Sequence, residues 1–332
     1  MNKFLSTFII LLCAGITVTA QQTGSGSKEK KRYEHYKERN ISRTFPAAGN
    51  ALSIDNSFGD VTVTTWDRNE IKVDIHIEAS SNQKDIAEKA FDNLDIIESK
   101  DGNTIKFKTT TEKNKGANWS CKICRITMDV SYTIQIPAGN SLKIDNSFGA
   151  IKIPDYKGPV SLVSKFGSLQ AGTLVNVEKV WVEFGKANLK SLNNTNATFK
   201  FSTIVIENLS GSNTIKMEFC GSTKIVLDND LTGLTLNESY STVNLKPASN
   251  LSATYHIRSS FGSLKDRSNA NIQRTDKPDQ YGPDSDRTYE GKSGSGSAKI
   301  EIKSSFGKII IGEATAEEMK EKDKKSKAGV TV

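Results

Sequence analysis

The chain has 332 residues, a formal net charge of +7, four cysteines and three histidines. This length allows one large elongated domain or two ordinary ones. The histidines are scattered, at His35, His76 and His256, and the sequence contains no Ser/His/Asp set, P-loop or HExxH motif. Composition therefore gives little support to an enzyme that uses histidine chemistry.

Residues 1–20 have the pattern of a secretory signal peptide. Lys3 is the positive start, an apolar run extends from Phe4 to Val18, and the run ends in small residues at Thr19 and Ala20. The run is too short for a membrane span and no stop-transfer pattern follows, so we expect no transmembrane span after signal removal. The mature chain is expected to be exported to the periplasm, the outer membrane or the cell surface.

A basic segment follows the expected cleavage point. Residues 28–39, KEKKRYEHYKER, contain six bases and three acids, and they follow the flexible stretch TGSGS. Such runs can bind nucleic acid or anionic surfaces. Because an exported protein does not meet nucleic acid in its ordinary setting, we expect no nucleic-acid partner. We interpret residues 21–44 as a flexible basic N-terminal arm.

From residue 45 to residue 312 a short phrase recurs around one aromatic residue. IDNSFG occurs at residues 54–59 and again at residues 144–149. From Phe148 the next aromatics follow at steps of 18, 18, 17, 18, 21 and 21 residues. The nine aromatic positions are Phe58, Phe148, Phe166, Phe184, Phe201, Phe219, Tyr240, Phe261 and Phe306.

Apolar residues lie at fixed distances on both sides of each aromatic. Four residues before it stand Ile54, Ile144 and their equivalents, and most repeats carry apolar residues three and five positions after it. Alternate apolar positions are typical of a strand with one buried face. The step of two becomes a step of three across the aromatic, and we attribute this change to a bend at the following glycine, such as Gly59.

One such repeat cannot bury its apolar face alone, whereas stacked repeats can. The sequence therefore predicts an all-β fold, a single-chain β-solenoid (β-helix-like) with rungs of about 18–21 residues. In-register stacking would place the nine aromatics in one internal, structural column. One residue before the aromatic, charges of opposite sign alternate from repeat to repeat, which predicts a structural row on the surface: Lys165, Glu183, Lys200 and Glu218.

Two insertions interrupt the repeats. Residues 64–130 should contain strands, a short helix at 82–95 and a hairpin at 94–110 with Asp101-Gly102 in its turn. We expect this insertion to cover the N-terminal end of the stack. Residues 265–297 are polar and should form a mobile loop, and the charged tail, residues 313–332, should be a frayed helix or disordered.

Cys121 and Cys124 have the CxxC spacing of redox and metal sites. The sequence after them alternates like a strand, whereas a thioredoxin-like site needs a helix there. A local disulfide between Cys121 and Cys124, or two ordinary thiols in a loop, fits an exported chain better.

Two groups of possible metal ligands are present. Asp74, His76 and Glu78 alternate along one expected strand, and we interpret them as its solvated face. Four acids of the second insertion do not have the spacing of a twelve-residue calcium loop: Asp276, Asp279, Asp284 and Asp286. The sequence therefore assigns no catalytic, cofactor-binding or metal-binding residue, and no cofactor.

Three segments, residues 61–75, 132–153 and 296–312, resemble the exported bacterial "putative adhesin" domain family. This is a domain of unknown function related to autotransporter-adhesin-like head domains. The resemblance extends over roughly residues 45–312. It implies a β-helix-like fold and a cell-envelope setting, and it carries over no catalytic residue.

These observations favour a non-enzymatic exported protein of the cell envelope, an adhesin-like β-solenoid that presents a repetitive binding surface to an unknown glycan or envelope protein. A second hypothesis is a periplasmic scaffold or sensor component of an envelope system, with the basic arm as its contact. A third is a β-helix carbohydrate-active enzyme, which would need two carboxylates in one groove. No such pair stands out in the sequence.

Overall fold

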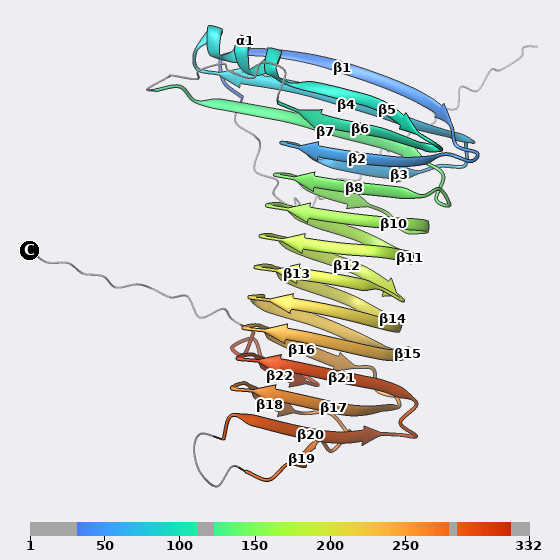
Figure 1. The fold of residues 1–332 in the computed structure, drawn as a ribbon, viewed down its shortest axis with the longest axis vertical. Coiled ribbons are helices and arrows are strands. Elements are labelled where there is room, and N and C mark those ends of the chain that lie inside the picture. The colour runs from blue at the N-terminus through green and yellow to red at the C-terminus, as the bar shows by residue number, and fades with distance from the viewer. Residues whose placement is uncertain (1–31, 112–122, 279–283, 320–332) are drawn as a thin grey trace, which may run out of the picture. The chain divides into compact units, whose positions relative to one another are not determined.

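The computed structural model describes residues 32–111, 123–278 and 284–319. All of them belong to one compact unit, Arg32–Val332. The fold is all-β apart from one short helix (Figure 1). The expected signal peptide lies outside the described residues. The described part of the chain contains no helix that is long and apolar enough to cross a membrane.

Strands that precede the aromatics pair in one ladder, which we call the front ladder. Its neighbours are parallel, and each residue is paired with the equivalent residue of the next repeat, for example Leu162 with Val180. In order, the front ladder consists of β6 (Thr104–Thr110), β2 (Ala51–Ser57), β8 (Leu142–Ser147), β10 (Tyr156–Lys165), the second half of β11 (Ser168–Glu183), β13 (Asn196–Lys200), the second halves of β14 (Thr203–Glu218) and β15 (Ser222–Ser239), β21 (Ala298–Ser305) and β17 (Ala253–Ser260).

Strands that follow the aromatics form a second parallel ladder, the back ladder. The strands β11, β14 and β15 belong to both ladders because each runs from the back ladder to the front ladder. In order, the back ladder consists of β7 (Ile126–Ile136), β3 (Val61–Thr65), β9 (Ala150–Ile153), the first half of β11, β12 (Lys186–Asn193), the first halves of β14 and β15, β16 (Thr242–Pro247), β22 (Lys308–Ile311) and β18 (Ser263–Asp266).

The inward residues of the two ladders form one core. The apolar positions four residues before each aromatic are buried, as are those three and five residues after it in most repeats. The alternation of apolar residues in the sequence therefore marks the buried side of each strand correctly.

The repeats do not stack in chain order at the C-terminal end. The front-ladder strand that comes last in the sequence is β21. It pairs with β15 on one side and with β17 on the other, so the repeat that is last in the sequence lies between two earlier ones (Figure 1). Beyond β17, the strand β20 (Asp286–Ser293) pairs antiparallel with it, and β19 (Gln273–Arg274) pairs with β20. The prediction of a mobile loop at 265–297 is therefore wrong where β19 and β20 form, and β20 covers the edge of β17 at the end of the front ladder.

Antiparallel strands and the helix cover the N-terminal end. The strand β4 (Glu70–Ser81) lies between β1 (His35–Pro46) and β7, and β5 (Asp95–Asp101) forms the expected hairpin with β6. The helix α1 (Lys84–Asn93) packs against β4 and β1. Its buried residues are Ile86, Ala87 and Ala90.

Two predictions about flexible ends need correction. Residues 35–44, which we expected in a flexible arm, form most of β1, because Ile41 and Phe45 pack against the core. The beginning of the expected disordered tail is also held in place, since Glu318 forms ion pairs with Lys265 and Arg267 at 2.8 and 2.7 Å. Residues 21–31 of the arm and 320–332 of the tail lie outside the described residues.

Candidate functional site

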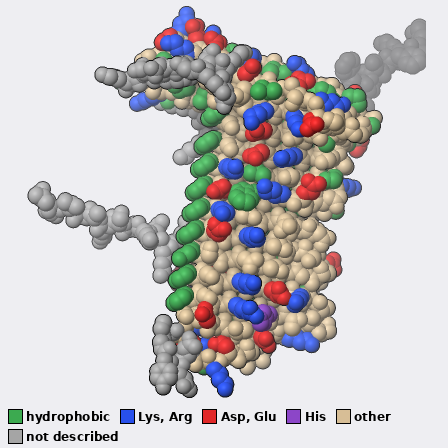
Figure 2. Space-filling model, viewed as in Figure 1, with side chains coloured by type: hydrophobic (Ala, Val, Ile, Leu, Met, Phe, Trp, Pro, Cys, Tyr) green, Lys and Arg blue, Asp and Glu red, His purple; other side chains and the backbone are tan. Residues whose placement is uncertain are grey.

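The nine aromatic rings form a continuous stack on the outside of the protein, which we call the aromatic ladder. Neighbouring ring centroids are 4.7–6.0 Å apart, with interplanar angles of 0–8°. Eight of the rings are 44–58% exposed, and only Phe58 is more buried. Figure 2 shows the ladder as a narrow apolar strip beside charged side chains. The structure thus brings the nine residues together, but the predicted internal position is wrong.

Backbone conformation explains why the rings point outward. Residues two and four positions before the aromatic point inward, so simple alternation would turn the aromatic inward as well. All nine aromatics instead have φ between 47° and 73°, in the left-handed region. This conformation redirects the side chain to the surface and produces the change of phase that we had attributed to the following glycine.

The glycine that follows many of the rings has a different role. A Cβ on Gly149 would lie 1.9 Å from the carbonyl oxygen of Gly59, and a Cβ on Gly167 would lie 1.9 Å from that of Gly149. Successive repeats therefore approach each other so closely at the bend that no side chain fits between their backbones.

The predicted charge row lies directly beside the aromatic ladder. Lys165 is in register with Glu183, Glu183 with Lys200, and Lys200 with Glu218. The last two form an ion pair at 2.9 Å, which raises the pKa of Lys200. Such exposed pairs contribute little to stability, because solvent screens the charges. The row therefore gives the surface a defined charge pattern more than it holds the fold together.

An inward polar column, which sequence reasoning missed, explains the repeated phrase IDNSFG. Asn56 and Asn146 stand two residues before their rings and are buried. The Nδ2 group of Asn56 donates to Asn146 Oδ1 and to the carbonyl of Val130, both at 2.9 Å. Asn146 donates to the carbonyl of Gly59 at 3.0 Å. The asparagine of the phrase therefore has the same use in both copies: Asn56 donates to the stacked Asn146, and each of the two donates to a backbone carbonyl at the bend.

The same inward position holds a carboxyl group in the repeat of Tyr240. Glu238 is 4% exposed and accepts hydrogen bonds from the hydroxyl of Ser304 and the backbone N–H of Ser241. Burial raises the pKa of Glu238 to about 7. Because both of its hydrogen bonds join neighbouring parts of the core, we regard Glu238 as a structural group whose charge state affects stability.

Glu238→Gln should flatten the pH dependence of stability in mildly acidic solution. The raised pKa means that the folded protein holds this proton more tightly than the unfolded chain, where the usual value is 4.5. The wild-type protein should therefore lose stability as pH rises from 4.5 to about 7, by roughly 3 kcal/mol. Denaturant unfolding at several pH values measures the slope. An equal slope in the variant would assign the effect to another group.

The strand face with Asp74, His76 and Glu78 holds a cluster with two carboxylates and one imidazole. Ligand atoms of Glu38, His76 and Glu78 lie within 4.8 Å of one another. Arg32 already provides a positive charge there, 2.6 Å from Glu38 and 3.3 Å from Glu78. Asp74 is paired with Lys72 at 2.7 Å. These contacts agree with a solvated strand face.

The described acids of the second insertion have partners within the protein. Arg274 binds Asp276 at 2.7 Å and pairs with Asp284, and its hydrogen bonds lower the pKa of Asp276 to about 2. Asp286 accepts a hydrogen bond from Ser260, and Asp279 lies outside the described residues. Cys121 also lies outside them, so its pairing with Cys124 stays a prediction.

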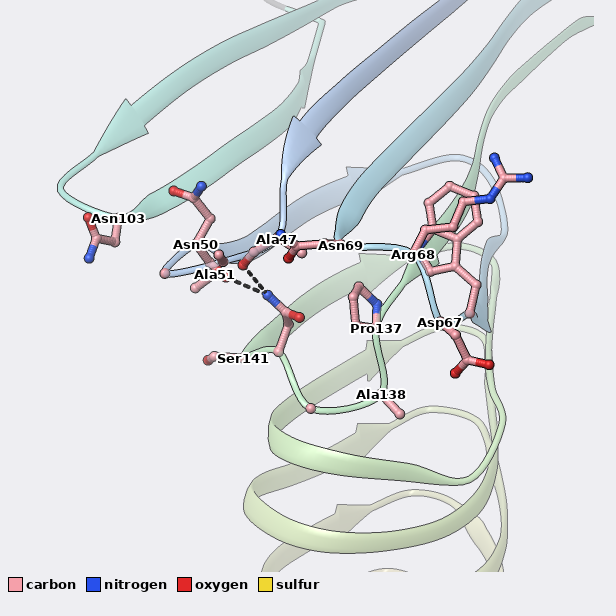
Figure 3. A pocket seen from close by; sticks show the side chains of 15 residues that line it. Ala47, Asn50, Ala51, Asp67, Arg68, Asn69, Asn103, Pro137, Ala138 and Ser141 are labelled. Atoms are coloured by element: carbon pink, nitrogen blue, oxygen red, sulfur yellow. Dashed lines mark hydrogen bonds between the residues drawn. The ribbon is translucent and has the colours of Figure 1, made fainter.

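A hollow lies between the loops that contain residues 47–51, 66–69 and 137–141, and Asn103 also lines it (Figure 3). It has a volume of about 720 Å³. Asn140 donates to the carbonyls of Ala47 and Asn50, at 2.7 and 2.8 Å. The side-chain amide of Asn140 thus links two neighbouring loops by hydrogen bonds. We therefore interpret the hollow as the junction between the N-terminal cover and the first repeats.

Among the comparisons with known proteins, the search of solved structures found proteins that are similar to this chain. No family model and no curated protein matches the chain. A "putative cell adhesion protein" from Clostridium sporogenes is 12% identical, with 84% of this chain and 100% of that chain covered and a TM-score of 0.23. A "putative adhesin" from Bacteroides fragilis is 12% identical, covering 82% and 97%, with a TM-score of 0.35.

A "putative adhesin" from Parabacteroides merdae is 10% identical, covering 85% of this chain and 98% of that chain, with a TM-score of 0.38. These names include the family that the sequence resembles. Identities and scores of this size assign no role to any residue of this chain, and membership of the family stays a proposal.

Proposed function

We propose that the chain is an exported, non-enzymatic protein of the cell envelope, an adhesin-like β-solenoid that presents a repetitive surface to a glycan or protein partner. The parallel pairing of equivalent residues from repeat to repeat supports the solenoid interpretation. The binding surface consists of the aromatic ladder and the adjoining outer side of the front ladder.

The exposed aromatic ladder is the observation that carries this proposal. A left-handed bend alone would be served better by glycine or asparagine, since a bulky side chain pays roughly 1–2 kcal/mol there. Stacking recovers about 0.5–1.5 kcal/mol per ring pair. Stacking does not require the apolar edges to face water, however, and contiguous exposed apolar surface is characteristic of interaction sites.

The regular spacing suits an extended partner. Each repeat offers a similar ring edge and a similar polar row, so a long partner can make many weak contacts at once. Combined contacts of this kind raise the apparent affinity well above that of any single contact. A repeating glycan or an extended protein segment fits this surface better than a compact small molecule does.

The triple substitution Phe166→Asn, Phe184→Asn and Phe201→Asn tests the role of the ladder. Asparagine tolerates the left-handed backbone, so the bends should survive while three neighbouring apolar edges disappear. We expect the variant to remain folded and to lose capture by isolated bacterial envelopes and by a panel of immobilised polysaccharides, measured by co-sedimentation.

A matched control carries Gln170→Ala and Asn188→Ala, two exposed changes on the back ladder. It should sediment with the same material as the wild-type protein. Unchanged capture by a folded triple variant would remove the ladder from the binding surface and leave it a purely structural feature.

A further inference from the structure

We propose that the outer surface of the front ladder around Trp181 binds a hexuronate, a sugar ring that carries a carboxylate. This proposal rests on the proposed function, to which it adds the class of ligand and the place of binding. The position of the indole, the way it is held and the charge beside it support the assignment.

Trp181 occupies an outward position in β11, three residues before the ring of its repeat, Phe184. Its neighbours in register are Val163 on β10 and Thr198 on β13. Figure 2 shows an apolar patch beside the aromatic ladder, among basic and acidic side chains. A large aromatic ring on a flat strand face can stack against the C–H side of a pyranose, which buries apolar surface of both.

The indole is held against the strands. Its Nε1 group donates a hydrogen bond to Glu183 at 3.3 Å. Val163 points outward, yet it is only 5% exposed, so neighbouring side chains must cover it, and Trp181 is the large side chain in register beside it. A ring that is already fixed loses little conformational freedom when a ligand binds.

Two ammonium groups lie over the indole ring. The Nζ atoms of Lys179 and Lys200 lie 5.2 and 5.6 Å from the ring centroid. Lys200 is paired with Glu218, whereas Lys179 has no carboxylate within ion-pair distance among the described residues. Lys179 is therefore available to a carboxylate of a ligand, and charge-assisted hydrogen bonds of this kind are the stronger ones.

The combination selects one ligand class. A neutral sugar could stack on Trp181 but would leave Lys179 unused, and a sulfated polyanion could use the lysines without the indole. A hexuronate uses both, because its carboxylate projects from the edge of the ring while its C–H side covers the indole. In a polyuronate, further residues of the chain would lie over the adjoining repeats.

The test uses the mature chain, residues 21–332, in affinity electrophoresis with three probes. The probes are polygalacturonate, its methyl ester, which has the same backbone without charge, and dextran sulfate, which has charge without carboxylates. We expect retardation by polygalacturonate alone. Trp181→Ala should weaken it by about tenfold or more, as expected for an aromatic hot spot, and Lys179→Gln should weaken it and reduce its dependence on salt.

Trp66→Ala is the matched control, since Trp66 also has a cation over its ring, with Arg68 at 5.1 Å, but lies at the end of β3 away from the aromatic ladder. It should bind as the wild-type protein does. Thermal melting shows that each variant is folded, and Lys179→Gln, an exposed change, keeps the test valid if Trp181→Ala unfolds.

Retardation by the methyl ester as strong as by polygalacturonate would overturn the proposal, as would equal binding by a folded Trp181→Ala variant and the wild type. Absence of binding to polygalacturonate, or binding to dextran sulfate that no substitution at Trp181 changes, would overturn it as well. If the triple ladder variant loses envelope capture in any of these cases, the proposed function stands and the hexuronate site alone fails.

Discussion

Phe199→Ala should lower the free energy of unfolding by about 3–5 kcal/mol, because it leaves a cavity in the middle of the core. Phe199 has no exposed surface, and it lies in register between Val182 and Met217 of the neighbouring repeats. Both neighbours are fixed in their own strands, so the cavity can close only by distorting the stack. Equilibrium denaturation measured by circular dichroism gives the loss.

Phe201→Asn is the matched comparison, since Phe201 stands two residues later in the same repeat. It is 45% exposed and has φ of 47°, a conformation that asparagine accepts. The variant loses two stacking contacts, with Phe184 and Phe219, worth about 0.5–1.5 kcal/mol each. Its loss should therefore stay below that of Phe199→Ala. Equal losses would contradict the assignment of Phe199 to the core and of Phe201 to the surface.

Gly167→Ala should destabilise the protein by roughly 3 kcal/mol, at the upper end of the range for overpacked sites. Its Cβ would lie 1.9 Å from the carbonyl oxygen of Gly149, and because that atom belongs to the backbone, two repeats have to separate. The aromatic stack next to the bend should loosen as well. Thermal unfolding, followed by near-ultraviolet circular dichroism of the aromatics, measures both effects.

Gly139→Ala provides the control for this change. A Cβ at Gly139 meets nothing within 4 Å, and its backbone is not in the left-handed region. Alanine there should leave stability unchanged or raise it by about 0.4–1 kcal/mol through the unfolded chain. If the Gly167 and Gly139 variants melt at the same temperature, close approach of the backbones cannot be the reason for the glycine at the bend.

The strands and their pairing could be predicted because apolar spacing follows directly from burial. Residues such as Ile144, Leu162 and Val180 occur at one fixed distance from the ring, and that distance alone determines which positions meet in register. The charge row follows from the same alignment. The sequence therefore predicts which positions of neighbouring repeats are paired, even where the residues at those positions differ.

The side on which the rings lie could not be predicted in the same way. A change of phase shows that one residue leaves the extended conformation, but it does not show which one. Glycine accepts positive φ without strain, whereas a bulky residue seldom does, so the glycine was the natural choice. The actual choice of Phe166 and its equivalents depends on stacking across repeats, which becomes visible only once the repeats are assembled.

Other parts of the fold were hidden by polar residues. In β1, the exposed side chains alternate with few apolar ones, so the segment looked like a solvated arm. The alternation of β11 shows that Trp181 points outward. Its position beside Val163 depends on the pairing with β10, and its position near the Lys179 ammonium depends on the orientation of the indole, so the sequence alone predicts neither. Binding surfaces built from several repeats are harder to recognise than a motif in one segment.

The position of the last repeat between two earlier ones has a consequence for how the protein is made. Synthesis delivers β17 before β21, whereas in the finished fold β21 is the strand that joins β17 to β15. Pairing in chain order can therefore extend the front ladder only as far as the repeat of Tyr240 before β21 has been made. A product that ended before residue 298 would lack β21 and would leave one edge of β15 and one edge of β17 unpaired. Unpaired strand edges favour aggregation.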